Sequence, residues 1–366
     1  MNICASFVLL ILGSLGLHAQ ESFLIYAPSR SSKSLRVLEA NVEGKTVELK
    51  GVVEYLLGFS ATTITKHPDK DLLYVTTNGG SEGQCSAATV ELNGNGTPQR
   101  HHSHLLKNGY AGLAVNVKAS WLAGASYRTG WLDVYQLDND GRIGKALVSR
   151  YEEKKNAHFV LISPDYKNLY VPYVKNFNAL MQYEIDGKTL TSLNSLDAKP
   201  PEGTGPRHLA NHPGGKFVYS SNEQRPGASV YQRLPNGQLK HLQICDAFEE
   251  FPRESGLSSS DIQCTTDGRF VFVGIRDRAK EHNAIARYKV NEDKTLTFLG
   301  RTPADAVPWG LALSPDGHHL LATGTTTGTL QVFRVGGEGG LALAAKYEWG
   351  DKVTDLVTRP QISPER

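Results

Sequence analysis

Four side chains suited to acid–base chemistry recur at similar spacing in the middle of the sequence. The imidazole of His158 and the guanidinium of Arg207 stand 49 residues apart, and the carboxylate of Glu223 and the guanidinium of Arg276 stand 53 residues apart. A carboxylate or an imidazole can take a proton from water. Arginine stabilises a developing oxyanion or clamps a carboxylate. These residue types predict acid–base chemistry on a carboxyl or lactone group.

A repeat of about 49 residues accounts for this spacing. Six turns related to Pro-Asp-Gly each precede an apolar segment, and the steps between their proline-equivalent positions are 49, 47, 49, 53 and 49 residues. A seventh copy begins with FLIYA at Phe23. Each unit adds a third strand, as at 132–137, 284–290 and 329–335, and a fourth, as at 236–242 and 338–344. Four short antiparallel strands repeated seven times predict an all-β chain that folds as a seven-bladed β-propeller.

The repeats are out of phase with the ends of the chain. After a predicted signal peptide at 1–20, only Glu21 and Ser22 precede the first strand, so the first blade lacks its innermost strand. The segment 353–359 follows the last complete unit. We expect it to fill the gap and close the ring, because an open array would leave an unpaired strand edge. Residues 21–366 then form a single propeller domain.

The repeat also predicts which polar residues meet. The first strand of a blade starts on the same face of the propeller on which the second strand ends, so residues at these two places converge on one mouth of the central channel. His158 and Arg207 occupy the first position in consecutive blades, and Glu223 and Arg276 occupy the second. We expect these four side chains to line one rim.

These residues lie in segments that resemble a known family. The stretch GTGPRHLANHPGGKFVYSSNE (203–223) resembles the GxGPRH…HPdGk…Y..NE signature of the seven-bladed lactonases, which include the propeller-type 6-phosphogluconolactonases and the fungal carboxymuconate lactonizing enzymes. The likeness extends over nearly all of the chain after residue 20, through AHFVLISPD, SDIQCTTDGRFVFVGIRDR and VPWGLALSPDGHHLLA. It implies that His158, Arg207, Glu223 and Arg276 are the catalytic residues.

The same motifs also suggest substrate-binding residues, and at four positions this chain differs from the family pattern. We take His208, Asn222 and Asp261 as substrate-binding residues, and we expect neither a metal nor a cofactor. The family's Asn, Arg, Glu and Asp are replaced here, respectively, by Ile275, Trp309, Asp261 and Tyr173. Loss of the arginine would weaken binding of an anionic substrate, which makes a phosphorylated sugar lactone a less secure assignment.

The resulting hypothesis is a lactonase-like hydrolase that acts on a small sugar or carboxylate-bearing lactone. Glu223 or His158 would activate water, and the two arginines would stabilise the oxyanion. A cycloisomerase that forms a lactone from an unsaturated dicarboxylate needs the same groups. A non-catalytic binding module is the alternative from another class, because the fold alone does not decide function. Such a module would depend on exposed aromatic residues such as Trp131 or Trp349.

Several of the residues named above, and two further groups, also have structural interpretations without a catalytic role. Arg207 and Glu223 could form only a structural ion pair, and Arg276 could be a solvated member of a charged run. The HHSH cluster at 101–104 is interpreted as an exposed loop rather than a metal site. Cys245 and Cys264 could form a disulfide or remain thiols.

The composition and the first twenty residues indicate the expected partners and cellular location. The chain of 366 residues has 21% charged residues and a net charge of +2, without a long basic run, so we expect no nucleic-acid partner. Residues 1–20 carry an apolar run too short to span a bilayer and a small residue, Ala19, near a cleavage point. We therefore expect a secreted or periplasmic monomer with no membrane segment after cleavage and a small-molecule lactone or carboxylate as substrate.

Overall fold

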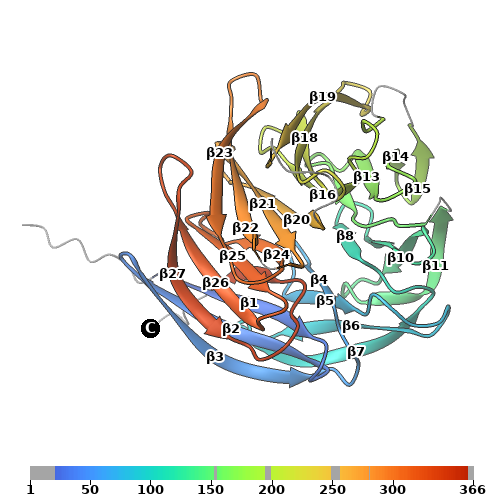
Figure 1. The fold of residues 1–366 in the computed structure, drawn as a ribbon. Helices are drawn as coiled ribbons and strands as arrows, with labels where there is room; N and C mark the ends of the chain where they lie inside the picture. The colour runs from blue at the N-terminus through green and yellow to red at the C-terminus, as the bar shows by residue number, and fades with distance from the viewer. Residues whose placement is uncertain (1–20, 152–154, 194–198, 249–255, 280, 362–366) are drawn as a thin grey trace, which may run out of the picture.

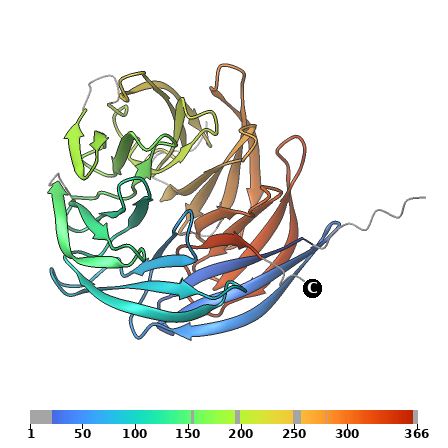
Figure 2. The same cartoon turned by 180° about the vertical axis from the view of Figure 1, so that it is seen from behind.

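The computed structural model confirms an all-β propeller. It describes residues 21–151, 155–193, 199–248, 256–279 and 281–361, and the predicted signal peptide lies outside these ranges. Within them, seven four-stranded antiparallel sheets, numbered here as blades 1 to 7, surround a central axis, and there is no helix (Figures 1 and 2). The repeat therefore predicted both the number of blades and the four strands in each blade.

The strands follow the chain from one blade to the next. Blades 1 to 3 contain β1 (Glu21–Ser29), β2 (Ser34–Glu43), β3 (Thr46–Leu56), β4 (Thr63–Lys66), β5 (Leu72–Thr76), β6 (Cys85–Leu92), β7 (Pro98–Leu106), β8 (Gly112–Asn116), β9 (Trp121–Ala125), β10 (Leu132–Leu137) and β11 (Ile143–Tyr151). Blades 4 and 5 contain β12 (Leu161–Ile162), β13 (Asn168–Tyr173), β14 (Ala179–Asp186), β15 (Thr189–Ser192), β16 (Pro206–Asn211), β17 (Phe217–Asn222), β18 (Gly227–Arg233) and β19 (Leu239–Asp246). Blades 6 and 7 contain β20 (Leu257–Cys264), β21 (Phe270–Asp277), β22 (Ala284–Val290), β23 (Leu296–Pro303), β24 (Pro308–Leu313), β25 (His319–Gly324), β26 (Thr329–Val335) and β27 (Leu341–Glu348).

The end of the chain closes the ring, as predicted. Strand β28 (Val357–Pro360) pairs antiparallel with β1 and completes blade 1 in the order β28-β1-β2-β3. It contacts β24 of blade 7 on one side and β4 of blade 2 on the other. The innermost place in blade 1 is thus filled by a strand more than 300 residues away in the sequence. This pairing covers the edge of β1 that would otherwise be exposed.

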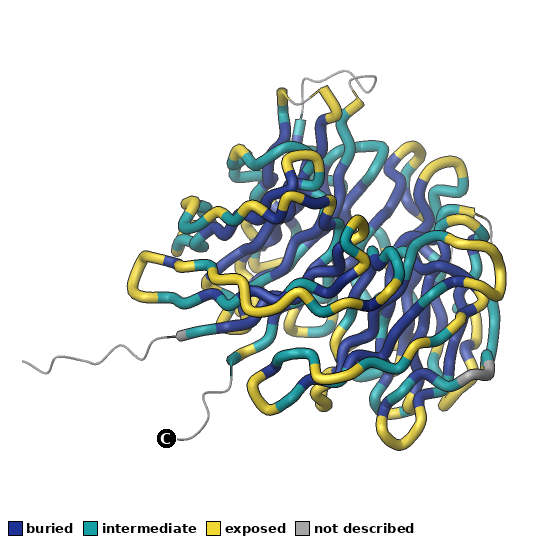
Figure 3. Tube along the Cα trace, turned by 90° about the horizontal axis from the view of Figure 1, so that it is seen from below, coloured by how far each residue is buried: buried dark blue, intermediate teal, exposed yellow. Residues whose placement is uncertain are grey.

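The hydrophobic core consists of seven clusters, each between two adjacent blades. In β1, for example, Phe23 and Ile25 pack against blade 7, and Leu24 and Tyr26 pack against blade 2. Because each sheet has a neighbour on both faces, inner strands such as β13, β21 and β25 are buried along their whole length. Figure 3 shows this distribution, with buried inner strands and exposed outer turns. Burial on both faces explains why the middle of each of these strands is apolar on both faces rather than on one.

A recurring tyrosine also links neighbouring blades. Tyr26 donates a hydrogen bond to the carbonyl oxygen of Gly96 at 2.6 Å, and Tyr74 donates one to Gly141 at 2.6 Å. Tyr170 repeats the contact with Gly237 at 2.8 Å. Each acceptor lies in the turn between the third and fourth strands of the next blade. These bonds satisfy buried hydroxyl groups and fix the position of each turn.

Several details differ from the sequence prediction. The HHSH segment is part of β7 rather than a loop, and His102 contacts Glu91 at 2.8 Å. The fourth strands β19 and β27 begin three residues later than predicted. Trp349 is not an exposed aromatic, because only 5% of it is accessible and it belongs to the core between blades 7 and 1.

The cysteines and the hydropathy add two findings. Within the described ranges no disulfide forms, so Cys245 and Cys264 are not bonded to each other. No helix long and apolar enough to cross a membrane occurs among the residues described.

The closure of the ring makes the packing between blades 7 and 1 important for stability. Leu330 is fully buried in this cluster, so we expect Leu330→Ala to lower the free energy of unfolding by about 2–5 kcal/mol. The matched control is Leu343→Ala in the same blade, because Leu343 is 56% exposed. That control should cost no more than about 0.5 kcal/mol. Chemical denaturation measures both values, and equal values would contradict the assigned core.

Candidate active site

Three successive blades carry a β-bulge at the same place in their first strand. In blades 5, 6 and 7 the register shifts so that two residues of the first strand oppose one residue of the second. The paired bulge residues are Arg207 and His208 in β16, Ser260 and Asp261 in β20, and Trp309 and Gly310 in β24. A bulge re-aims side chains that would otherwise alternate between the faces of a sheet. Here it allows consecutive residues, Arg207 and His208, both to contact neighbouring blades near the axis.

Three of the four predicted catalytic residues form one ionic cluster. Glu223 follows β17 directly, and its Oε2 accepts hydrogen bonds from Arg207 Nε at 3.1 Å and from Arg276 Nη2 at 3.4 Å. Arg276 Nη2 also donates to the backbone carbonyl of Ser259 at 2.9 Å. Arg276 is only 7% exposed and is therefore not a solvated member of a charged run. The ion pair between Arg207 and Glu223 exists, and a second guanidinium joins it.

The two guanidiniums are buried with part of their hydrogen-bonding capacity unused. Arg207 is fully buried, and neither of its Nη atoms has a partner among the described residues. Burial lowers the pKa of Arg207, and burial together with the nearby Arg207 charge lowers the pKa of Arg276 to about 9. Buried polar groups in native proteins nearly always have partners. Unsatisfied donors next to a cleft therefore favour an anionic or carbonyl-bearing ligand.

His158 completes the predicted cluster. It lies just before β12, and its ring centroid is 5.5 Å from that of Tyr127 and 5.1 Å from that of His208. Burial and the positive charge of Arg207 hold the pKa of His158 well below its ordinary value. The imidazole is consequently neutral at pH 7. A neutral imidazole can donate one hydrogen bond and accept another without adding a charge to the cluster.

A cleft of about 510 Å³ opens over these residues at one mouth of the ring. His158, Glu223 and Arg276 line it, and Arg207 lies beneath them in contact with Glu223. Trp309 lines it as well, and its ring centroid is 4.4 Å from the guanidinium carbon of Arg276 and 5.3 Å from that of Arg207. The residue that replaces the family's arginine is thus an aromatic surface against which two guanidiniums pack.

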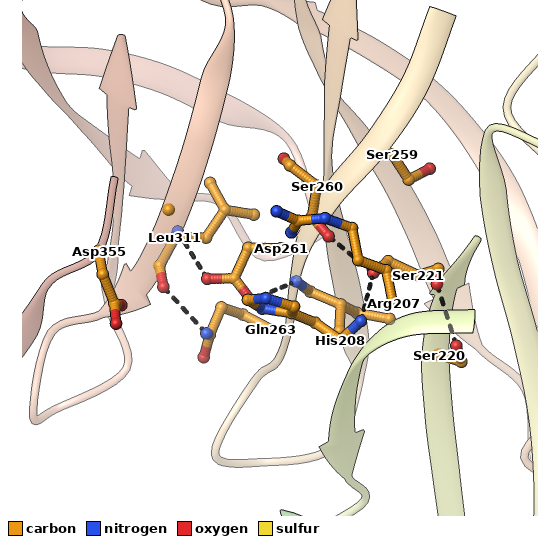
Figure 4. Close-up of polar contacts among 12 residues, drawn as sticks. Arg207, His208, Ser220, Ser221, Ser259, Ser260, Asp261, Gln263, Leu311 and Asp355 are labelled. Atoms are coloured by element: carbon orange, nitrogen blue, oxygen red, sulfur yellow. Dashed lines mark hydrogen bonds and ion pairs between the residues drawn. The ribbon is translucent and has the colours of Figure 1, made fainter. Parts of the chain in front are cut away.

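His208 and Asp261 occupy a deeper level. His208 Nδ1 lies 2.8 Å from Asp261 Oδ1, and Asp261 Oδ2 accepts a hydrogen bond from the backbone N–H of Leu311 at 2.8 Å (Figure 4). Both side chains line a second cavity, of about 330 Å³, in the channel below the cleft. Their bond links blades 5 and 6 and fixes the His208 ring next to His158. Burial lowers the pKa of His208, although Asp261 opposes this effect.

Asn222 does not line either cavity. Its side chain is fully buried and exchanges hydrogen bonds with Ser229 Oγ on the next strand, at 3.0 and 3.1 Å. This pairing anchors the end of β17, directly before Glu223. Asn222 therefore holds the carboxylate in place from within the blade rather than facing the open cleft.

Four residues with ionisable side chains near the channel were not singled out from the sequence. Tyr127, Lys175 and Arg278 line the cleft. Asp355, in the segment that closes the ring, lines the lower cavity, where both of its oxygens accept backbone N–H groups, from Ile64 and Leu356. The repeat could have indicated Lys175 and Arg278, because each follows the end of a second strand. Nothing in the repeat indicated Asp355, since 353–359 is not part of a complete unit.

The described residues contain no cluster of three or more His, Cys, Asp or Glu side chains arranged to hold a metal. In the HHSH segment, His102 contacts Glu91, and His104 Nε2 lies 3.1 Å from Thr89 Oγ1. These histidines therefore make contacts within blade 2.

Comparison with known proteins gives a family match. The model of the family described as "Lactonase, 7-bladed beta-propeller" matches residues 24–354. A protein named 6-phosphogluconolactonase from Xenorhabdus nematophila is 26% identical over 337 residues, which cover 89% of this chain and 96% of that protein. Another protein of that name, from Cronobacter sakazakii, is 28% identical over 325 residues, which cover 87% and 92%.

Solved structures show the same fold. A periplasmic gluconolactonase from Pseudomonas aeruginosa aligns with a TM-score of 0.81 at 21% identity, covering 94% of this chain and 100% of that one. A protein from Bacteroides fragilis described as a putative 6-phosphogluconolactonase aligns with a TM-score of 0.80 at 20% identity, covering 93% and 98%.

The half-buried Asp355, whose side chain lines the lower cavity, predicts a pH dependence of stability. Burial raises its pKa from 3.8 to about 8. Between these values the unfolded chain is ionised at this residue while the folded chain keeps its proton, so this contribution to stability is present at low pH and is lost as the pH rises towards 8. Asp355→Asn removes it.

We therefore expect the stability of the wild type relative to Asp355→Asn to fall between pH 5 and pH 8. Chemical denaturation at several pH values measures this difference. Asp69→Asn, at an exposed turn, is the matched control and should show no such trend. A difference between wild type and Asp355→Asn that does not change with pH would contradict the raised pKa.

Proposed function

The chain belongs to the family of seven-bladed β-propeller lactonases, and on that premise we propose that it hydrolyses a small sugar or carboxylate-bearing lactone such as 6-phosphogluconolactone. The observation that carries the proposal is a carboxylate, Glu223, held between two buried guanidiniums in an open cleft. The relatives named 6-phosphogluconolactonase and the periplasmic gluconolactonase that shares the fold support it.

In the proposed reaction, Glu223 acts as the general base. It takes a proton from a water molecule as the water oxygen attacks the lactone carbonyl carbon. The carbonyl oxygen becomes an oxyanion, which the N–H groups of Arg207 and Arg276 stabilise. The ring C–O bond then breaks, and the proton passes from Glu223 to the departing ring oxygen. The products are a hydroxyl group and a carboxylic acid, which ionises and releases a proton to solution.

The remaining predicted residues would support this step. His158 is neutral, so it would hydrogen-bond the substrate or the water without competing for the negative charge. His208 and Asp261 would keep the His158 side of the cleft in position through their 2.8 Å contact. Asn222 would hold the end of β17, and hence Glu223, through Ser229.

The setting of the enzyme is also part of the proposal. We infer that residues 1–20 are a signal peptide and that residues 21–366 act as one propeller domain, a monomer, in the periplasm or outside the cell. The periplasmic gluconolactonase that shares the fold supports this location.

The general-base role is tested by Glu223→Gln, which keeps the size of the side chain and removes its basicity. We expect kcat for lactone hydrolysis to fall by about 10²–10⁴-fold while the protein remains folded. Proton release from a panel of phosphorylated and unphosphorylated sugar lactones and a muconolactone measures the rate.

The matched control is Glu281→Gln, because Glu281 has a side chain 77% exposed and lies outside the cleft. Its rate should equal that of the wild type. An unchanged rate in Glu223→Gln would remove Glu223 from the mechanism. A folded wild type that opens none of the lactones would overturn the proposed function itself.

A further inference from the structure

Four cationic side chains lie in the cleft or directly beneath it. Arg207 and Arg276 share the single carboxylate of Glu223, and two further cations, Lys175 and Arg278, line the same cleft. Glu223 is the one acidic side chain among the described residues that line the cleft, and Asp261, at the level below, also attracts Arg207. Low-dielectric walls concentrate such a field and attract anions.

Lys175 and Arg278 occupy related places on either side of Glu223. Lys175 follows β13 in blade 4, Glu223 follows β17 in blade 5, and Arg278 follows β21 in blade 6. All three residues therefore lie where a second strand ends at the mouth of the ring. Lys175 and Arg278 are exposed at the rim, whereas Arg207 and Arg276 are buried below.

Neither rim cation has an ion-pair partner of its own within the ranges that the structure describes. Among the described residues, no carboxylate forms an ion pair with Lys175 or Arg278, whereas most arginines near the blade surfaces do have such a partner. The Lys175 ammonium lies 5.4 Å from the ring centroid of Tyr127. A hydrogen bond to Tyr127 raises the pKa of Lys175, while Arg278 opposes this effect by repulsion. Glu223 also attracts Lys175, but this carboxylate is already paired with Arg207 and Arg276.

We propose that Lys175 and Arg278 form a rim subsite that binds an anionic substituent of the lactone, a phosphate or a carboxylate, while Arg207 and Arg276 serve the reacting carbonyl below. This inference rests on the proposed lactone hydrolysis. The substituent takes no part in bond breaking and leaves unchanged with the product. The two pairs have different roles. The buried arginines stabilise the oxyanion that forms during the reaction, and the rim cations bind a negative charge that the substrate already carries.

The rim subsite can compensate for the family's arginine, which is replaced by Trp309 in this chain. Trp309 packs against both buried guanidiniums and carries no charge, so it cannot hold an anion at its own position. Lys175 and Arg278 supply two positive charges at another part of the same cleft. An anionic substrate therefore remains compatible with the departure at Trp309.

The test compares three lactones that differ in charge. These are a sugar lactone with a phosphate group, a muconolactone with a carboxylate and an uncharged sugar lactone, each assayed with the wild type and with the double variant Lys175→Gln/Arg278→Gln. Charge-assisted hydrogen bonds each change binding by about tenfold or more. We expect the ratio of kcat/KM for the anionic to the uncharged lactone to fall by roughly 10–100-fold, mainly through KM. The lactone that loses more identifies phosphate or carboxylate as the preferred group.

The matched control is Lys118→Gln/Lys216→Gln, which removes the same charge from exposed turns between first and second strands, on the opposite face. Its ratio should equal that of the wild type. Added salt should lower the wild-type ratio, because exposed charges are screened. An unchanged ratio in the cleft double variant would overturn the rim subsite while leaving the hydrolase proposal intact.

A binding measurement separates failure of the subsite from failure of the hydrolase proposal. Calorimetry with 6-phosphogluconate and with gluconate reports binding of the phosphate group without turnover. If no lactone is hydrolysed, tighter binding of 6-phosphogluconate by the wild type, lost in the double variant, would still support an anion-binding rim. Equal binding of the two compounds, or equal binding by both proteins, would exclude it.

Discussion

The structure depends on the burial of both faces of every blade. A four-stranded sheet with two apolar faces is stable only between two neighbours, so a row of such sheets always leaves one apolar face uncovered at each end. Closure into a ring removes both ends at once. Blade 1 illustrates the requirement, because Phe23 and Ile25 need blade 7 while Leu24 and Tyr26 need blade 2. The pairing of β28 with β1 completes the last sheet of the ring.

This closure also creates the position of the candidate site. In a ring of radial sheets, the first strands come together around the axis, so residues from blades 4 to 7 approach one another although they are about 150 residues apart in the chain. Bulges in β16, β20 and β24 then direct two consecutive residues of each first strand towards this region. The rigid packing between blades holds those residues in place, which is what a preorganised catalytic site requires.

The charges in the site are held against a considerable desolvation cost. Moving a guanidinium out of water is unfavourable unless hydrogen bonds and opposite charge compensate. Glu223 supplies one carboxylate for two guanidiniums, the Ser259 carbonyl accepts one hydrogen bond, and the Trp309 ring packs beside both cations. The two Nη atoms of Arg207 remain without partners among the described residues. Such incomplete compensation is typical of sites that bind a charged ligand or stabilise charge formed in a reaction.

The periodic features of this protein could be predicted from its sequence. The period of about 49 residues predicted the number of blades. Strands such as 284–290 and 329–335 have the predicted bounds because apolar segments bounded by turn residues are local signals. Equivalent positions in the repeat also predicted that His158, Arg207, Glu223 and Arg276 lie close together at one mouth of the ring. The fold and these residues were predictable because each repeat encodes the same local geometry.

Features that depend on contacts between repeats could be seen only in the folded protein. A β-bulge has no clear sequence signal, so the sequence could not show that Arg207 and His208 lie at two levels of the channel. Nor could it show that the Asn222 side chain bonds within its own blade. The HHSH segment carries polar residues because β7 is an outer strand, which looks like a loop in sequence. Asp355 lines the lower cavity because the segment that contains it inserts into the ring. Lys175 and Arg278 share a cleft because curvature brings blades 4 and 6 to the same mouth. These are properties of the closed ring, which no single repeat contains.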